Sequence, residues 1–149
     1  MERIAVFIND AAHARHLLQP MIGAAGPTHW ILVACPPTLT RHIGRWVSHA
    51  ARQAWRQRWG EELLAQLAPE LAARTGSQVE RMVASRPLTD VSARLAARLP
   101  DVRLLDARRP TLGKPHEPLT TMQPPEGGRR WAGTVAMAGG FTAMLALAD

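Results

Sequence analysis

Short apolar runs alternate with amphipathic stretches along the first 107 residues of the chain. The run Ile4–Ile8 is apolar at every position and ends in Asn-Asp, which is typical of a strand buried on both faces. Residues 28–34 have the same character, whereas residues 77–85 alternate more and indicate a strand near the edge of a sheet. The pattern predicts strands over residues 3–8, 28–34, 77–85 and 101–107, and helices over residues 11–25, 38–74 and 87–99.

Strands that alternate with helices predict a parallel sheet covered by helices on both faces. Because crossovers between parallel strands are right-handed, this order predicts a doubly wound, mostly parallel sheet of four to five strands, a Rossmann-like three-layer sandwich. The length of 149 residues suits a single α/β domain. Asp10 is expected to cap the first helix, and Pro20 is expected to bend or restart it.

The predicted helix 38–74 carries a line of arginines. At about 100° per residue, its first half has an arginine ridge on one side and apolar residues on the other. Beyond Trp59 leucines occupy the side of the ridge, so Gly60 is predicted to kink or break the helix. Three interpretations of the ridge stay open: a solvated helix face, a dimer contact, and a site for nucleic acid or phosphate. The ridge consists of Arg41, Arg45, Arg52 and Arg56.

The regular pattern stops at Arg108. Residues 108–130 form a long loop rich in proline and glycine, and residues 131–149 form an apolar segment. Alternation from Trp131 onward predicts a fifth strand followed by a short helix. The alternative is a tail at residues 131–148 that associates with a membrane or is buried by a partner, although its glycines disfavour insertion. Because these apolar side chains need a cover, we expect a homodimer.

The net charge of +6 suggests polyanionic partners, but the composition weakens that suggestion. Of the eighteen basic residues all but Lys114 are arginine, and with frequent alanine this is typical of a GC-rich genome, so nucleic acid is not the favoured partner. The single cysteine, Cys35, excludes an internal disulfide. The first residues lack the layout of a signal peptide, and we expect a cytoplasmic protein.

Candidate chemistry is sparse. The chain has no Walker loop, no Gly-x-Gly-x-x-Gly turn after the first strand, no nucleophile elbow and no metal-ligand spacing. No catalytic residue or metal ligand is therefore predicted, which favours a binding protein over an enzyme. Open parallel sheets bind ligands beyond the carboxyl ends of their strands. The candidate ligand-binding residues at that edge are Asn9, Asp10, Ala34 and Cys35.

The stretches "VFIND" and "ILVACPP", followed by a long second helix, resemble the universal stress protein family over residues 3–107. The resemblance implies a stress-response role and a site for ATP or another adenine nucleotide, in which Asp10 bonds the adenine or ribose edge. In the nucleotide-binding branch of that family, a G-x2-G-x9-G-[ST] loop after the fourth strand holds the phosphates. The glycines of this chain do not have that spacing, so we expect weak or no ATP binding.

Two features near the end of the loop bear on the phosphates. Gly127, Gly128, Arg129 and Arg130 would form an anion nest with two positive charges, or simply a turn before a strand. Thr134 follows Gly133 and offers a hydroxyl group, although not at the spacing of the family loop.

These observations favour a small universal-stress-like ligand-binding or regulatory protein, acting as a homodimer with a small-molecule ligand. One alternative is a nucleotide-binding enzyme of the hydrolase type, with Asp10 and Arg129 at the phosphates. A second alternative is a basic module that binds nucleic acid through the arginine ridge.

Overall fold

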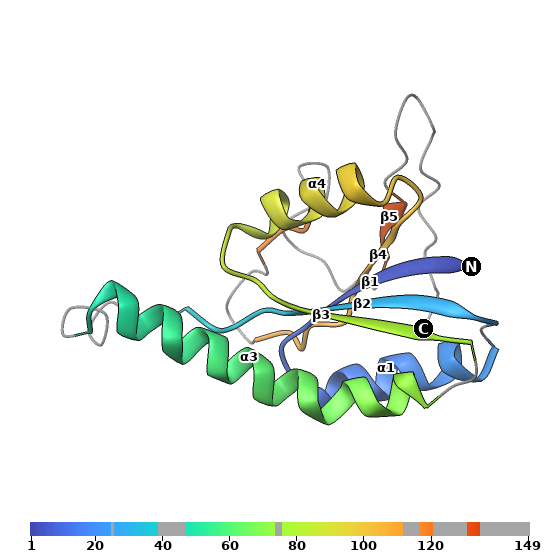
Figure 1. The fold of residues 1–149 in the computed structure, drawn as a ribbon, viewed down its shortest axis with the longest axis horizontal. Helices are drawn as coiled ribbons and strands as arrows, with labels where there is room; N and C mark the ends of the chain where they lie inside the picture. Colours follow the sequence, from blue (N-terminus) through green and yellow to red (C-terminus); the bar gives the residue numbers. More distant parts are fainter. Residues whose placement is uncertain (25, 39–46, 74–75, 112–116, 121–130, 135–149) are drawn as a thin grey trace.

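The structure is a computed structural model that describes residues 1–24, 26–38, 47–73, 76–111, 117–120 and 131–134, the last four as backbone only (Figure 1). The predictions for Arg41, Arg45, Gly127, Gly128, Arg129 and Arg130 lie outside the described residues.

Five strands form one sheet in the order β3-β2-β1-β4-β5. The first four strands are parallel, and β5 runs antiparallel to β4 at the edge. The strand order reverses direction between β1 and β4, which is the topological switch point of a doubly wound sheet. The strands are β1 (Glu2–Ile8), β2 (Thr28–Ala34), β3 (Gln78–Val83), β4 (Arg103–Asp106) and β5 (Trp131–Thr134).

Helices cover both faces of this sheet, as the sequence predicts. Helices α1 (Ala11–Ala24) and α3 (His49–Ala72) lie below the sheet in Figure 1, and α4 (Leu88–Arg98) lies above it. Two helices on one face and one on the other are what right-handed crossovers require when the chain moves from β1 out to β3 and then back to β4. The predicted three-layer α/β fold is therefore confirmed.

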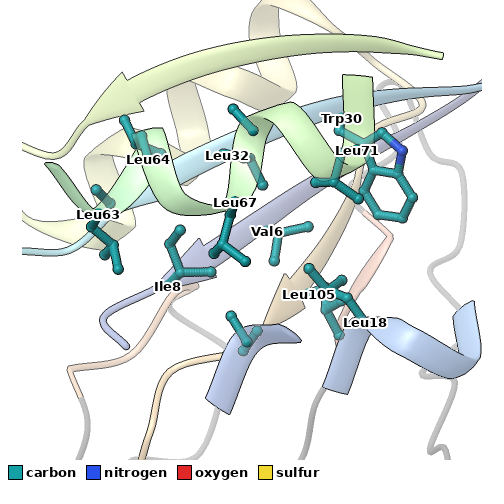
Figure 2. Close-up of a cluster of buried hydrophobic side chains, with 14 of the residues drawn as sticks. Val6, Ile8, Leu18, Trp30, Leu32, Leu63, Leu64, Leu67, Leu71 and Leu105 are labelled. Carbon is teal, nitrogen blue, oxygen red and sulfur yellow. The ribbon is translucent and has the colours of Figure 1, made fainter. Parts of the chain in front are cut away.

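The alternation of side chains divides the core into two layers. Ile4, Val6 and Ile8 of β1 point to the face of α1 and α3, where they meet four leucines of α3 (Figure 2). Ala5 and Phe7 point to the opposite face and pack with α4. All five side chains of this run are at most 2% exposed, which explains why the run is apolar at every position. The leucines of α3 are Leu63, Leu64, Leu67 and Leu71.

Helix α1 continues through Pro20, contrary to the expected restart. Pro20 is exposed, and the helix is held by Ala14 and Leu18, which are buried against the sheet. Burial of this apolar face outweighs the hydrogen bond that proline cannot donate.

Helix α3 departs from the prediction in two ways. It begins at His49, where the Ser48 side chain accepts a hydrogen bond from the Ala51 amide, and not at residues 38–40. It also runs unbroken through Gly60, so the predicted kink is wrong. Gly60 is buried, and a Cβ atom there would lie 2.6 Å from both methyl groups of Val83. The glycine is therefore explained by close packing of α3 on β3, which leaves no room for a side chain.

Because α3 is continuous, the two ridge arginines that it contains share one stripe with its leucines. Arg52 and Arg56 are partly buried and precede Gly60 and Leu63 at helical spacing on the side that faces the sheet. The solvated-face interpretation therefore does not hold for these two arginines.

The other predicted boundaries agree with the structure to within a few residues. Strand β3 lies at an edge, and the expected fifth strand is present at Trp131–Thr134. Residues 135–149 lie outside the described part of the chain. Within the described residues, no helix has the length and hydropathy needed to span a bilayer.

We predict that Gly60→Ala destabilises the protein, although alanine is the better helix former by about 1 kcal/mol. The added methyl group overlaps Val83, and overpacking of this kind costs about 1–3 kcal/mol. The free energy of unfolding should be measured by urea denaturation.

The variant Val83→Ala, alone and combined with Gly60→Ala, provides the control. The Gly60→Ala substitution should cost less in the Val83→Ala background, because the overlapping methyl groups are gone. A Gly60→Ala variant more stable than the wild type would contradict the close packing of α3 and β3.

Candidate functional site

The four parallel strands end in step, which brings their carboxyl ends to one edge of the sheet. The Cys35 amide donates to the Ile8 carbonyl at 2.8 Å, and the Ala107 amide donates to the Phe7 carbonyl at 2.9 Å. The Ala84 amide continues the pattern by donating to the Ala34 carbonyl at 2.9 Å. The predicted residues Asn9, Asp10, Ala34 and Cys35 therefore meet at this carboxyl edge, as the sequence predicts.

At the switch point, Asn9 joins β1 to the segment after β4. Its side-chain oxygen accepts a hydrogen bond from the Arg109 amide at 2.6 Å, and its side-chain nitrogen donates to the Arg109 carbonyl at 3.2 Å. Both ends of the side-chain amide are thus bonded to one main-chain residue. Asn9 therefore ties the end of β1 to the segment after β4, and a ligand between them would have to displace these bonds.

Asp10 caps α1, as predicted. Its Oδ1 atom accepts a hydrogen bond from the His13 amide at 2.8 Å, and its Oδ2 atom lies 3.5 Å from the Arg109 guanidinium. The His13 hydrogen bond is the main reason why the pKa of the Asp10 carboxyl is lowered, and the charge of Arg109 adds to the effect. Asp10 is therefore ionised at neutral pH, and both of its oxygen atoms already have partners.

The end of β4 carries a buried ion pair that the sequence analysis did not single out. The Arg108 guanidinium donates to both carboxylate oxygens of Asp106 at 2.9 Å, and the two side chains are 5% and 4% exposed. The same guanidinium donates to the Glu117 carbonyl. Arg108 therefore fixes the course of the chain after β4.

Glu117 in turn caps α4. Pro87 precedes this helix and gives no side-chain cap, and the Glu117 carboxylate accepts a hydrogen bond from the Leu88 amide at 2.9 Å. Leu119, two residues further on, is fully buried in the layer beneath α4. Neither contact is visible in the sequence, because no local pattern links residues 88 and 117.

Cys35 lies beside this cluster and has an unreactive thiol. Burial raises the pKa of the thiol to about 12, and the charge of Arg108 opposes this only in part. The Sγ atom lies 3.6 Å from the Val33 carbonyl, to which it can donate. A group that stays protonated at neutral pH is a poor nucleophile, so Cys35 serves packing.

Arg56, one of the two described arginines of the ridge, reaches the carboxyl edge from α3. The amino-terminal part of α3 extends past the ends of the strands (Figure 1). Arg56 donates to the Pro37 and Ala84 carbonyls, both at 3.3 Å, and so joins the segments that follow β2 and β3. Arg52 lies one turn earlier, about 6 Å along the axis. Its Nε atom is buried and has no hydrogen-bond partner among the described residues.

Thr134 is not part of this edge. It pairs with Arg103 at the amino end of β4, three residues before Asp106, which corresponds to about 10 Å of strand. Among the described residues, no group of three histidine, cysteine or acidic side chains could hold a metal ion.

The chain was also compared with known proteins. No family model, no curated protein and no solved structure matches it. The likeness to universal stress proteins therefore rests on the layout of the sequence alone.

We predict that native Cys35 reacts slowly with Ellman's reagent between pH 7 and 9, because its thiolate is scarce in that range. The rate should rise by at least ~100-fold when the protein is unfolded in urea, where the thiol regains its ordinary pKa. Absorbance at the wavelength of the released dye follows the reaction. A native rate close to that of the unfolded chain would show an accessible, activated thiol.

We predict that Asp106→Ala lowers the free energy of unfolding by about 3–5 kcal/mol, because it leaves the Arg108 charge buried without its partner. The matched control is Asp101→Ala, which removes an exposed ion pair with Arg3 at 3.4 Å and should cost at most about 1 kcal/mol. Adding Arg108→Leu to Asp106→Ala should recover part of the loss. If urea denaturation showed the same decrease in the free energy of unfolding for both aspartate variants, this account of the Asp106–Arg108 ion pair would be wrong.

Proposed function

We propose that the protein is a universal-stress-like binding protein that takes a small anionic ligand, such as a phosphorylated metabolite. The ligand would bind beneath the amino-terminal part of α3 that extends past the ends of the strands. The protein acts as a regulator and not as an enzyme. The ligand would lie at the carboxyl edge of the sheet, against Arg52 and the segments that follow β2 and β3. This edge is where open α/β sheets commonly bind their ligands.

The observation that carries the proposal is that the Arg52 guanidinium lacks a partner among the described residues. Arg52 and Arg56 form no ion pair with any described carboxylate. Arg56 meets carbonyl oxygens, whereas the buried Nε atom of Arg52 has no described partner. A buried guanidinium donor without an acceptor is costly, and a phosphate or carboxylate would supply both the acceptor and the opposite charge.

The chemistry at the edge supports binding without catalysis. Asp10 caps a helix, Asp106 is neutralised by Arg108, and the Cys35 thiol is protonated. None of these three groups is available as a general base or a nucleophile. The hydrolase alternative requires a reactive carboxylate at the phosphates. Asp10 disfavours that role because its carboxylate already caps α1.

The contacts of Asp10 also bear on the binding of ATP. The resemblance assigns the adenine or ribose contact to Asp10, whose Oδ1 atom is taken by the His13 amide and whose Oδ2 atom faces Arg109. We therefore favour a small phosphorylated compound over ATP as the ligand. A homodimer that covers the apolar residues 131–149 remains part of the proposal.

We predict that pyrophosphate, used as a simple anionic probe, raises the melting temperature of the full chain and binds measurably in calorimetry. Arg52→Gln should weaken this binding at least ~10-fold, since a charge-assisted contact contributes roughly 1.5–3 kcal/mol. ATP with magnesium should bind no more tightly than pyrophosphate.

Arg58→Gln is the matched control, because Arg58 lies on the same helix with an exposed side chain. It removes the same charge and should leave the affinity within about twofold. Equal effects of Arg52→Gln and Arg58→Gln would indicate general charge attraction and contradict the site. Tight magnesium-dependent ATP binding would favour the hydrolase alternative, and binding to duplex DNA with a steep salt dependence would favour the nucleic-acid alternative.

A further inference from the structure

A groove lies between α3 and the edge strand β3, and neither Asn9, Arg109 nor Arg52 lines it. Its volume is about 390 Å³, which is within the range of small-molecule sites. Three residues of α3 and three of β3 line it: Gln57, Glu61, Leu64, Arg81, Met82 and Val83.

The lining combines an apolar surface with two opposite charges. Leu64 is 2% exposed and Val83 is half-buried, and both belong to the core layer on the α3 side of the sheet, so these two side chains form an apolar floor. The Met82 side chain packs in the layer on the α4 side, as the alternation of a strand requires. Glu61 and Arg81 are exposed, one from the helix and one from the strand. No ion pair joins them, although both line the same groove.

Each charge is free to meet a ligand. The Gln57 amide donates to Glu61 Oε1 at 3.0 Å, which orients the carboxylate, and the Oε2 atom has no described partner. Arg81 likewise makes no hydrogen bond or ion pair within the described part of the chain. The neighbouring Glu80 points to the opposite face of the sheet, where it pairs with Arg98 at 2.6 Å and does not neutralise Arg81.

We propose that this groove binds a zwitterionic amino acid with an apolar side chain. Its ammonium group would meet Glu61, its carboxylate would meet the Arg81 guanidinium, and its side chain would pack against Val83 and Leu64. A guanidinium matches a carboxylate in planar, two-bond geometry, and a carboxylate accepts well from an ammonium group. Because two opposite charges line one groove without pairing, a ligand that carries both charges fits it better than a simple cation or anion.

An added β-strand is the other occupant that an edge strand can accept. β3 carries Glu80 and Arg81 in succession, and charged side chains on an edge strand oppose such pairing. The observations therefore favour a small ligand held by side chains over a peptide held by main-chain hydrogen bonds.

The test uses isotope-labelled full-length protein titrated with L-leucine, N-acetyl-leucine and leucine amide, and follows backbone amide shifts. We expect leucine to shift the amides of residues 57–64 and 81–83. The two derivatives, each lacking one charge, should bind at least ~10-fold more weakly. Glu61→Gln should abolish the preference for leucine over N-acetyl-leucine, and Arg81→Gln should abolish the preference over leucine amide.

Glu62→Gln and Arg58→Gln are the matched controls, because both side chains are exposed on α3 and neither lines the groove. They should leave the affinity for leucine within about twofold. Since Glu61 and Arg81 are exposed, their variants should fold, which circular dichroism can verify. Equal affinity for leucine and both derivatives, or no shift at ~10 mM leucine, would overturn the proposal. Strand-like binding of a peptide unaffected by both variants would overturn it as well.

Discussion

The position of α3 depends on the absence of a side chain at residue 60. With glycine there, the helix comes close enough to β3 for the Val83 methyl groups to occupy the space of a Cβ atom. This contact allows one uninterrupted helix whose leucines enter the core and whose arginines extend along the same stripe beyond the sheet. The groove beside β3 and the anionic site that we propose at Arg52 both depend on the position of α3. Both would change if the helix were displaced outward by even the width of a methyl group.

The carboxyl edge of the sheet is held together by the protein's own polar groups. Asn9 bonds both main-chain groups of Arg109, and Arg108 connects Asp106 to the Glu117 carbonyl. The polar groups at the switch point thus mostly have hydrogen-bond partners within the chain. The polar groups without a described partner lie toward β2 and β3 instead. The ligand contact that we propose therefore comes from a helix side chain, Arg52, and not from the turn after β1.

The sequence predicted the architecture well because strand and helix periodicity are local properties. The apolar runs located the parallel strands, and the Asn-Asp pair after Ile8 located both the edge and the cap of α1. The sequence misled at Gly60, where helix propensity suggested a break, because the reason for glycine is a contact with Val83, 23 positions later. Glu117 was missed for the same reason, whereas Asp106 and Arg108, two residues apart, could have been noticed as a charged pair at the end of a buried strand.

The strand order also has a consequence for synthesis on the ribosome. β1 is central, but the strand that pairs with one of its edges, β4, is the last parallel strand to be made, and Ile4 pairs with Arg103. Translation proceeds at about 5–20 residues per second, so the β4 edge of β1 lacks its partner for roughly 5–20 s after β1 emerges. The cap of α4 is also incomplete until Glu117 has been added, 29 residues after Leu88. The nascent chain therefore carries an open, apolar strand edge until β4 has been made, and in this interval a chaperone could bind that edge.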